Sequence, residues 1–283
     1  MINDLCQENL KALAALSCGD FEKTQKILRE NARKWPSVLS FNNLGLYYLQ
    51  NGIICVNQKV RSSQKIAMHY LEKAHNIDSD WRNCLNLASA YYENGCIECA
   101  EKLLCESQNE KCYEINMYNL GVCKYRKGDY SNSIKYFENI ADSCSCKFVE
   151  EGGQHQLIVL AYNYYMLGDI PCCNEMVNRY RKIEKMENSL DIFVLRYLCG
   201  EYNAAAEECN NMLREWYPDY SVWAMVADCV DSGIVPMKTI EKNIDGKSMR
   251  NLMKLIANLD ERRRYINQYR YVVPFINYYI YIT

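Results

Sequence analysis

Residues 43–52 read Asn43-Leu44-Gly45-Leu46-Tyr47-Tyr48-Leu49-Gln50-Asn51-Gly52, and degraded copies of this stretch recur along the whole chain. Each copy closes on a glycine, and the closing residues are Gly19, Gly52, Gly95, Gly128, Gly168, Gly200 and Gly233. Four of the intervals between them are 32 or 33 residues long, and the other two are 40 and 43. A repeat of about 34 residues is typical of helix-turn-helix arrays. The sequence therefore predicts an all-α solenoid.

The residue types within each copy support this prediction. When the closing glycine is counted as position 15, Leu44 occupies position 7, Gly45 position 8 and Tyr48 position 11. The third copy repeats the pattern, with Leu87 and Ala88 at the first two of these positions. A small residue at position 8 allows two helices to approach closely, while large residues at helical spacing fill the space between them. The closing glycine supplies the left-handed backbone that ends a helix.

This pattern resembles the tetratricopeptide repeat (TPR) family, in which each repeat is a pair of helices joined by a turn. The resemblance implies a right-handed superhelical solenoid of about seven TPR-like units. It assigns residues 1–246 to the repeat array, with units near 5–37, 38–80, 81–113, 114–153, 154–185, 186–218 and 219–246. The second half of the second unit arrives late, so residues 53–64 contain an insertion. We expect this insertion to form either a longer loop or an extended helix.

Residues 247–283 depart from the repeat. Residues 247–264 have the amphipathic pattern of a helix, and residues 265–282 are rich in tyrosine and β-branched residues and are broken by Pro274. A terminal repeat has to cover an otherwise open apolar face, so the first expectation is a C-terminal capping helix followed by a Tyr-rich tail. Two alternatives stay open: a tail that docks a partner or another copy of the chain, and a chain that continues into a further domain.

Composition limits the classes of partner. The 283-residue chain is 49% hydrophobic, which is enough for a continuous core, and its formal net charge is −2. With a pI near 6.0 it has no global basic field to attract nucleic acid or acidic membranes. The first five residues lack the basic and apolar segments of a signal peptide, and no apolar run approaches the roughly 20 residues that span a bilayer. We expect a cytoplasmic protein with no nucleic-acid or membrane partner.

Sixteen cysteines are an unusual number for such a chain. Most of them stand where Ala, Ser or Leu would serve in a helical repeat, so we interpret them as small buried thiols in a reducing compartment. Cys96-Ile97-Glu98-Cys99 is the only CxxC motif. It would suit a redox role at a helix N-terminus, or half of a zinc site if a second pair lay nearby. Neither a thioredoxin-like pattern nor a well-spaced second pair accompanies it.

No catalytic motif stands out. The three histidines, His69, His75 and His155, are scattered, and no nucleophile motif flanks a cysteine. The sequence contains no glycine-rich phosphate loop and neither the zinc-protease nor the serine-hydrolase signature. We therefore predict a non-enzyme with no catalytic residue, no metal site and no cofactor.

The strongest candidate for a functional feature is a register of asparagines. The resemblance to the TPR family implies that positions 2, 5, 6, 9, 12 and 13 of each first helix line a concave groove. Position 6 is Asn43, Asn86 and Asn119 in three successive units, and Asp191 in the sixth. Because asparagine offers both a donor and an acceptor, such a ladder can pair with the backbone of an extended peptide. The alternative is chance together with structural pairing on this helix face.

Aromatic and basic residues flank this register. By the same resemblance, the groove-facing residues around it are Arg82, Tyr92, Tyr118, Tyr125, Arg126, Tyr162, Tyr165 and Tyr197. Tyrosine and arginine are enriched in binding hot spots, although a row of tyrosines can equally pack one repeat on the next. The leading hypothesis is a non-catalytic scaffold that binds a protein or peptide segment in the groove. The alternative is an assembly or regulatory module, or the accessory domain of a larger enzyme system, which acts through end-to-end docking or forms a homo-oligomer through its tail.

Overall fold

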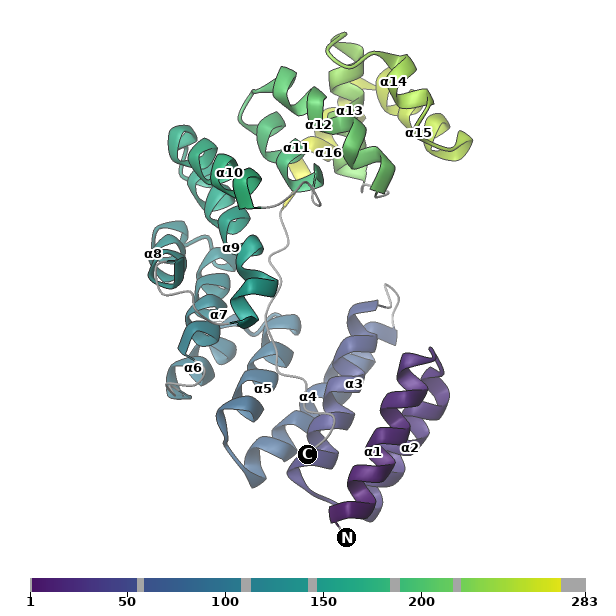
Figure 1. Ribbon diagram of the computed structural model, residues 1–283, viewed down its shortest axis with the longest axis vertical. Coiled ribbons are helices and arrows are strands. Elements are labelled where there is room, and N and C mark those ends of the chain that lie inside the picture. Colours follow the sequence, from purple (N-terminus) through teal and green to yellow (C-terminus); the bar gives the residue numbers. More distant parts are fainter. Residues whose placement is uncertain are drawn as a thin grey trace. The chain divides into compact units, whose positions relative to one another are not determined.

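The computed structural model describes residues 2–54, 59–107, 113–141, 147–183, 189–215 and 220–270. Within these ranges every regular element is a helix, and no strand occurs. The helices follow one another along the chain with short connections between them (Figure 1). None of the described helices is long and apolar enough to cross a membrane. The predicted all-α class is confirmed.

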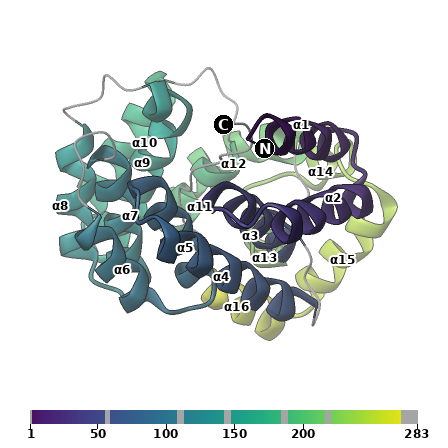
Figure 2. The same ribbon diagram turned by 90° about the horizontal axis from the view of Figure 1, so that it is seen from below.

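Two compact units divide the helices. The first contains Met1–Ile140 and the second contains Ala141–Val273. The helices of the first unit are α1 (Ile2–Ser17), α2 (Phe21–Lys34), α3 (Val38–Ile54), α4 (Lys59–Ile77), α5 (Trp81–Glu93), α6 (Ile97–Glu106), α7 (Tyr113–Arg126) and α8 (Tyr130–Ala141). Helices α1 to α7 lie each against the next, in the order of the sequence, and α1 to α5 can be followed from below in Figure 2.

The second unit begins with the same alternation and ends differently. Its helices are α9 (Lys147–Met166), α10 (Ile170–Ile183), α11 (Ser189–Leu198), α12 (Tyr202–Glu215), α13 (Tyr220–Asp231), α14 (Met237–Glu241), α15 (Gly246–Ala257) and α16 (Leu259–Gln268). Helices α9 and α10 form one hairpin and α11 and α12 the next, whereas α15 and α16 both lie against α13. The last two helices therefore cover a face of α13 that a regular helix hairpin would leave to the following repeat.

Six of the seven closing glycines end a first helix as predicted. The residues with positive φ, between 74° and 80°, are Gly19, Gly95, Gly128, Gly168, Gly200 and Gly233. At the first of these turns the N–H of Gly19 donates to the carbonyl of Leu16, and the N–H of Asp20 donates to that of Ala15. These bonds satisfy carbonyls at the helix end, and only glycine adopts the required backbone without strain.

Gly52 is the exception, and the prediction that it closes a helix is wrong. Helix α3 runs on through Gly52 to Ile54 and has 17 residues, and α4 has 19. Much of the insertion predicted at residues 53–64 is therefore accommodated by lengthening both helices of this pair. The extended-helix alternative holds for the described part of the insertion.

The small residues at position 8 allow the close approach that was predicted from the sequence. A Cβ placed on Gly121 would lie 2.9 Å from ring carbons of Phe137, which is fully buried. In the same contact the hydroxyl of Ser133 donates to the carbonyl oxygen of Gly121 at 2.9 Å. The first helix pair repeats this bond, since Thr24 donates to the carbonyl of Ala12 at 3.4 Å. In both pairs a side chain of the second helix thus contacts the backbone of the first helix at position 8.

The C-terminal helix predicted over residues 247–264 is two helices. Helix α15 ends before Asn258, and α16 begins after it. The side-chain oxygen of Asn258 accepts from the N–H of Glu261 at 3.1 Å and caps α16. The guanidinium of Arg262 on α16 is buried and forms ion pairs with Asp231 at 2.7 Å and with Asp228 at 3.2 Å. Asparagine is a favoured N-cap, which explains the break. The Tyr-rich tail from residue 271, and the self-association assigned to it, lie outside the described residues.

Candidate functional site

The predicted groove residues lie on the first helix of each pair. Helix α3 carries Asn43, α5 carries Arg82, Asn86 and Tyr92, and α7 carries Tyr118, Asn119, Tyr125 and Arg126. All of these belong to the first compact unit. Tyr162 and Tyr165 on α9 and Tyr197 on α11 belong to the second unit.

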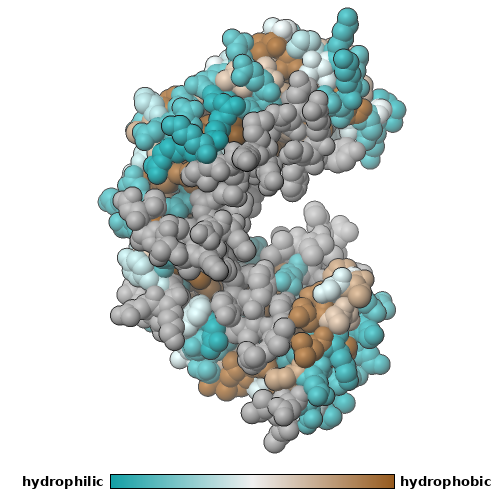
Figure 3. Space-filling model, in the orientation of Figure 1, coloured by the Kyte–Doolittle hydropathy of each residue, from teal (hydrophilic) through white to brown (hydrophobic). Residues whose placement is uncertain are grey.

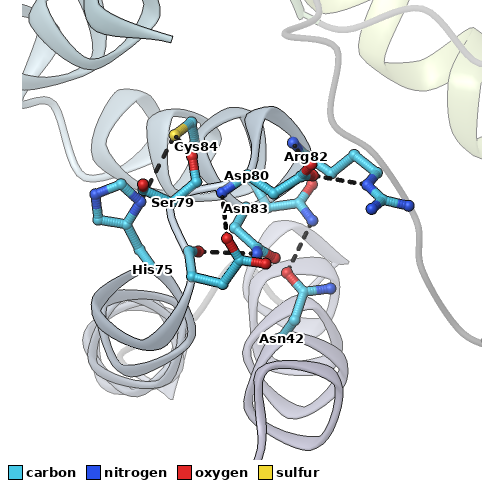
Figure 4. A network of polar contacts seen from close by, with 9 residues as sticks. Asn42, His75, Ser79, Asp80, Arg82, Asn83 and Cys84 are labelled. Atoms are coloured by element: carbon cyan, nitrogen blue, oxygen red, sulfur yellow. Dashed lines mark hydrogen bonds and ion pairs between the residues drawn. The ribbon is translucent and has the colours of Figure 1, made fainter.

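The three asparagines at position 6 are completely buried. Asn43, Asn86 and Asn119 each have 0% exposed surface. The Asn86 amide nitrogen donates to the side-chain oxygen of Asn42 at 2.9 Å, which joins α5 to α3 (Figure 4). The carboxamide of Asn43 differs, because neither its nitrogen nor its oxygen has a hydrogen-bond partner among the described residues. A buried amide in that state costs roughly 1–3 kcal/mol for each unpaired group.

Two further asparagines lie one position earlier in the repeat than these three. Asn9 and Asn42 both occupy position 5 and both are buried. Asn9 accepts from the amide nitrogen of Asn31 at 2.9 Å, as Asn42 accepts from Asn86. In both cases the remaining amide nitrogen is buried without a partner among the described residues. The adjacency of Asn42 and Asn43 in the sequence was the available signal for this second row.

Position 3 holds a polar register that the sequence analysis missed. Asn83 donates to the carbonyl of Asp78 at 3.0 Å, and Asn116 donates to that of Ser107 at 3.3 Å. Ser40 makes the equivalent bond to the carbonyl of Trp35 at 2.7 Å. Each bond satisfies a carbonyl just beyond a second helix from the start of the next first helix. The recurrence of Ser, Asn and Asn at this position would have revealed it.

The start of α5 shows how Arg82 is held. Asp80 caps the helix by accepting from the N–H of Arg82 at 3.0 Å, and it also accepts from the guanidinium of Arg82 at 2.7 Å (Figure 4). Beside it Cys84 bonds to the carbonyl of Ser79 at 3.2 Å and lies 3.6 Å from the ring nitrogen of His75. Arg82 is thus fixed in direction by its own N-cap residue, and its side chain remains partly exposed.

The predicted groove tyrosines of the first unit are buried or half-buried. Tyr118 is buried and stands edge-on to Phe137, with ring centroids 5.3 Å apart, and burial raises its pKa. Burial also raises the pKa of Tyr92 to about 12, although the nearby positive charge of Arg126 opposes this change. Tyr125 is half-buried and makes an edge contact with Tyr130 at 5.7 Å. Only Arg126 among the predicted residues of α7 is exposed.

Two tyrosines of the second unit bond within the fold. The hydroxyl of Tyr162 lies 2.9 Å from that of Tyr269, and the hydroxyl of Tyr197 donates to Asp228 at 2.9 Å. Both side chains are buried, while Tyr165 is half-buried. Asp228 also pairs with Arg262, so Tyr197 connects α11 to the C-terminal helices. The contact of Tyr197 agrees with the alternative that the tyrosine row packs successive helix pairs on one another, whereas Tyr162 joins α9 to a residue that follows α16.

The cysteines do not all fit the expectation of small buried thiols. Cys96 and Cys99 are joined as a disulfide at the start of α6, where Cys96 is the N-cap residue. Cys18 and Cys105 are exposed. Cys123 fits the expectation, because it is buried and its pKa is raised to about 12 by that burial. In the part of the chain that the structure describes, no cluster of three His, Cys, Asp or Glu side chains could hold a metal ion.

Exposed apolar side chains are spread over many helices. The larger ones are Leu10, Phe21, Ile77, Tyr113, Met166, Leu167, Tyr202, Tyr220, Met253 and Leu259. On the face shown in Figure 3, hydrophobic atoms form separate patches between hydrophilic ones. Apolar residues scattered singly are normal on a protein surface, so none of these patches marks a binding site by itself.

Comparison with known proteins identifies the fold. No family model and no curated protein matches the sequence. Among solved structures, a tetratricopeptide repeat protein from Parabacteroides merdae has a TM-score of 0.62 at 15% identity, over 91% of this chain and 99% of that chain. PilF of Pseudomonas aeruginosa has a TM-score of 0.59 at 17% identity, over 78% of this chain and 95% of that one. The apo form of RapI has a TM-score of 0.56 at 13% identity, over 94% and 99%. Similarity at this level of identity shows the fold.

Proposed function

We propose that this chain, whose fold is that of the tetratricopeptide repeat proteins, is a non-catalytic scaffold that binds an extended protein segment. The observation that carries the proposal is the carboxamide of Asn43, which is fully buried and has no hydrogen-bond partner among the described residues. It stands at the same repeat position as Asn86 and Asn119. An extended backbone offers an N–H and a C=O to the amide of Asn43 and would remove the cost of its two unpaired groups.

The spacing of the register suits an extended chain. Helix α3 contacts α5 directly. Packed helix axes lie about 8–10 Å apart, and an extended chain rises about 3.3 Å per residue. One asparagine would therefore meet about every third residue of a bound segment. Recognition of this kind depends on the ligand's backbone, so it favours an unstructured segment over a folded surface.

Side chains around the register would give such a site its selectivity. Arg82 and Arg126 supply positive charge, and the half-buried Tyr92 and Tyr125 supply aromatic surface in the same unit. These residue types favour a segment that carries carboxylates and apolar side chains. Because Asn43, Asn86 and Asn119 have no exposed surface, a ligand reaches them only after the side chains that cover them move.

The test uses peptides that are selected from a random display library because they bind the wild-type protein. Loss of two charge-free hydrogen bonds, at about 0.5–1.5 kcal/mol each, should weaken binding roughly 5- to 160-fold when Asn86→Ala and Asn119→Ala are combined. The matched control is Asn163→Ala, which removes a buried asparagine of the second unit whose amide nitrogen donates to the carbonyl of Val159 in its own helix at 2.8 Å. Equal affinity of the double variant and the wild type for every selected peptide would refute the asparagine ladder.

A further inference from the structure

Two cysteines far apart in the sequence meet where the α9–α10 pair contacts the α11–α12 pair. Cys173 lies in the first turn of α10, and Cys199 lies between the end of α11 and the turn residue Gly200. Their sulfur atoms are 3.5 Å apart. Cys173 is buried and Cys199 is half-buried. Because both belong to the second compact unit, this approach is a property of a single packed body.

A polar bridge beside the two sulfurs holds the two elements together. Glu201, two residues after Cys199, accepts from the side-chain nitrogen of Asn174 at 2.9 Å. It also pairs with the guanidinium of Arg196 on α11. Asn174 follows Cys173 directly in the sequence. The same junction is therefore fixed by a hydrogen bond on one side and by the sulfur contact on the other, so the thiols are positioned before any reaction.

The surroundings of the two thiols make them chemically unequal. The hydrogen bond with Cys173 and the positive charge of Arg196 lower the pKa of Cys199, although its partial burial and Glu201 oppose this. The same hydrogen bond, together with burial, raises the pKa of Cys173. The thiolate is the reactive form of cysteine. Cys199 is thus both the more accessible and the more acidic member of the pair.

We propose that Cys199 and Cys173 are a reversible oxidation site, in which a hydroperoxide reacts with Cys199 and Cys173 closes a disulfide. In the first step the Cys199 thiolate attacks the peroxide oxygen, the O–O bond breaks, and a sulfenic acid forms while the leaving hydroxide (or alkoxide) takes a proton from solvent to become water (or an alcohol). In the second step the Cys173 sulfur displaces the hydroxyl group of the sulfenic acid, and water leaves as the S–S bond forms. A dithiol reductant restores both thiols by exchange and becomes a disulfide itself.

The disulfide would fasten one helix pair to the next. It would join the second helix of the α9–α10 pair to the turn of the α11–α12 pair, which are otherwise held at this point by noncovalent contacts. The disulfide between Cys96 and Cys99 cannot act in this way, because both of its cysteines lie at the start of one helix. The inference is independent of the asparagine register, which lies in the other compact unit.

The test maps disulfides in the full chain after mild oxidation. The reduced protein is treated with stoichiometric hydrogen peroxide, free thiols are blocked, and tryptic peptides are analysed by mass spectrometry without reduction. Cys172 shares a tryptic peptide with Cys173, and Cys209 shares one with Cys199. The cross-link between these two peptides should persist in Cys172→Ser and in Cys209→Ser, and it should disappear in Cys173→Ser and in Cys199→Ser.

Fragment spectra of the wild-type cross-linked peptide assign the bond without relying on any variant to fold. The proposal is supported if the fragments place the bond between Cys173 and Cys199, and if added dithiothreitol reverses it. It is overturned if the bond involves Cys172 or Cys209. It is also overturned if Cys199 becomes a sulfinic acid with no cross-link, or if neither cysteine reacts under conditions that oxidise the exposed Cys18.

Discussion

Replacing Gly45 by alanine adds a single methyl group where α3 and α4 are in close contact. A Cβ at this position would lie 2.6 Å from the Cγ and 2.9 Å from the Cδ2 of Leu71, and 3.2 Å from the carbonyl oxygen of Ala67. Leu71 is only 1% exposed, so its side chain cannot turn outward. The Cγ is a branch point and the carbonyl belongs to the backbone of α4. Relief of the clash therefore requires that the helices separate or that Leu71 adopts a strained rotamer.

Two opposing effects set the size of the change. In a helix interior, alanine is favoured over glycine by about 1 kcal/mol. Overfilling a packed core costs about 1–3 kcal/mol. Contact with a branching carbon on one side and fixed backbone on the other puts Gly45→Ala near the upper end of that range. We expect a net loss of about 2 kcal/mol in the free energy of unfolding.

Urea denaturation followed by circular dichroism measures this change, and a double-mutant cycle tests its cause. Leu71→Ala alone should cost about 2–5 kcal/mol through the cavity that it leaves. The double variant should cost less than the sum of the two single variants, because the smaller side chain makes room for the new methyl group. Stability of Gly45→Ala at or above the wild type, or strict additivity in the cycle, would show that the close contact does not limit this position.

Three further outcomes follow from the structure. Arg262→Met should lower the free energy of unfolding by about 1–3 kcal/mol in urea denaturation, because it removes the buried partner of Asp228. The partial exposure of Asp228 limits this loss of stability. A change below ~0.5 kcal/mol would contradict the prediction. Tyr92 has a pKa raised from 10.0 to about 12 in the folded state, so its contribution to stability is complete below pH 10 and is lost as the pH rises toward 12; the difference in phenolate absorbance between wild type and Tyr92→Phe should titrate near pH 12 rather than near 10. In the native protein iodoacetamide should modify Cys18 long before Cys123, because the latter is buried and its pKa is raised to about 12; equal labelling rates by mass spectrometry would exclude that difference.

The repeat architecture could be read from single residue types because its key positions admit few alternatives. A positive φ strongly favours glycine, and Gly19, Gly95 and Gly233 all adopt it. A Cβ would not fit at Gly121 without displacing the ring of Phe137. Among the seven closing glycines, the prediction failed at Gly52. Gly52 is the last residue of the stretch 43–52, yet helix α3 continues through it. A glycine permits a turn but does not require one.

The candidate groove could be located only by helix and by repeat position. Sequence alone put Asn43, Asn86 and Asn119 in one register, and the structure confirms that they lie on three successive first helices. Their complete burial, and the bond from Asn86 to Asn42, depend on how closely α5 lies against α3. The repeat pattern specifies which residues face a neighbouring helix, but it does not specify the atoms that they meet.

The sequence by itself determined the helix-turn-helix fold, the positions of six turns, and the small residues at which the two helices of a pair come into close contact. Each of these follows from local backbone geometry or from the absence of a side chain. Only the tertiary structure decided the partners of the polar groups. Cys173 meets Cys199 across 26 residues, Tyr197 meets Asp228 across 31, and Asn42 meets Asn86 across 44. Such pairs form across the contact between one helix pair and the next, and the rotation of each pair on its neighbour is set by the sum of many side-chain contacts.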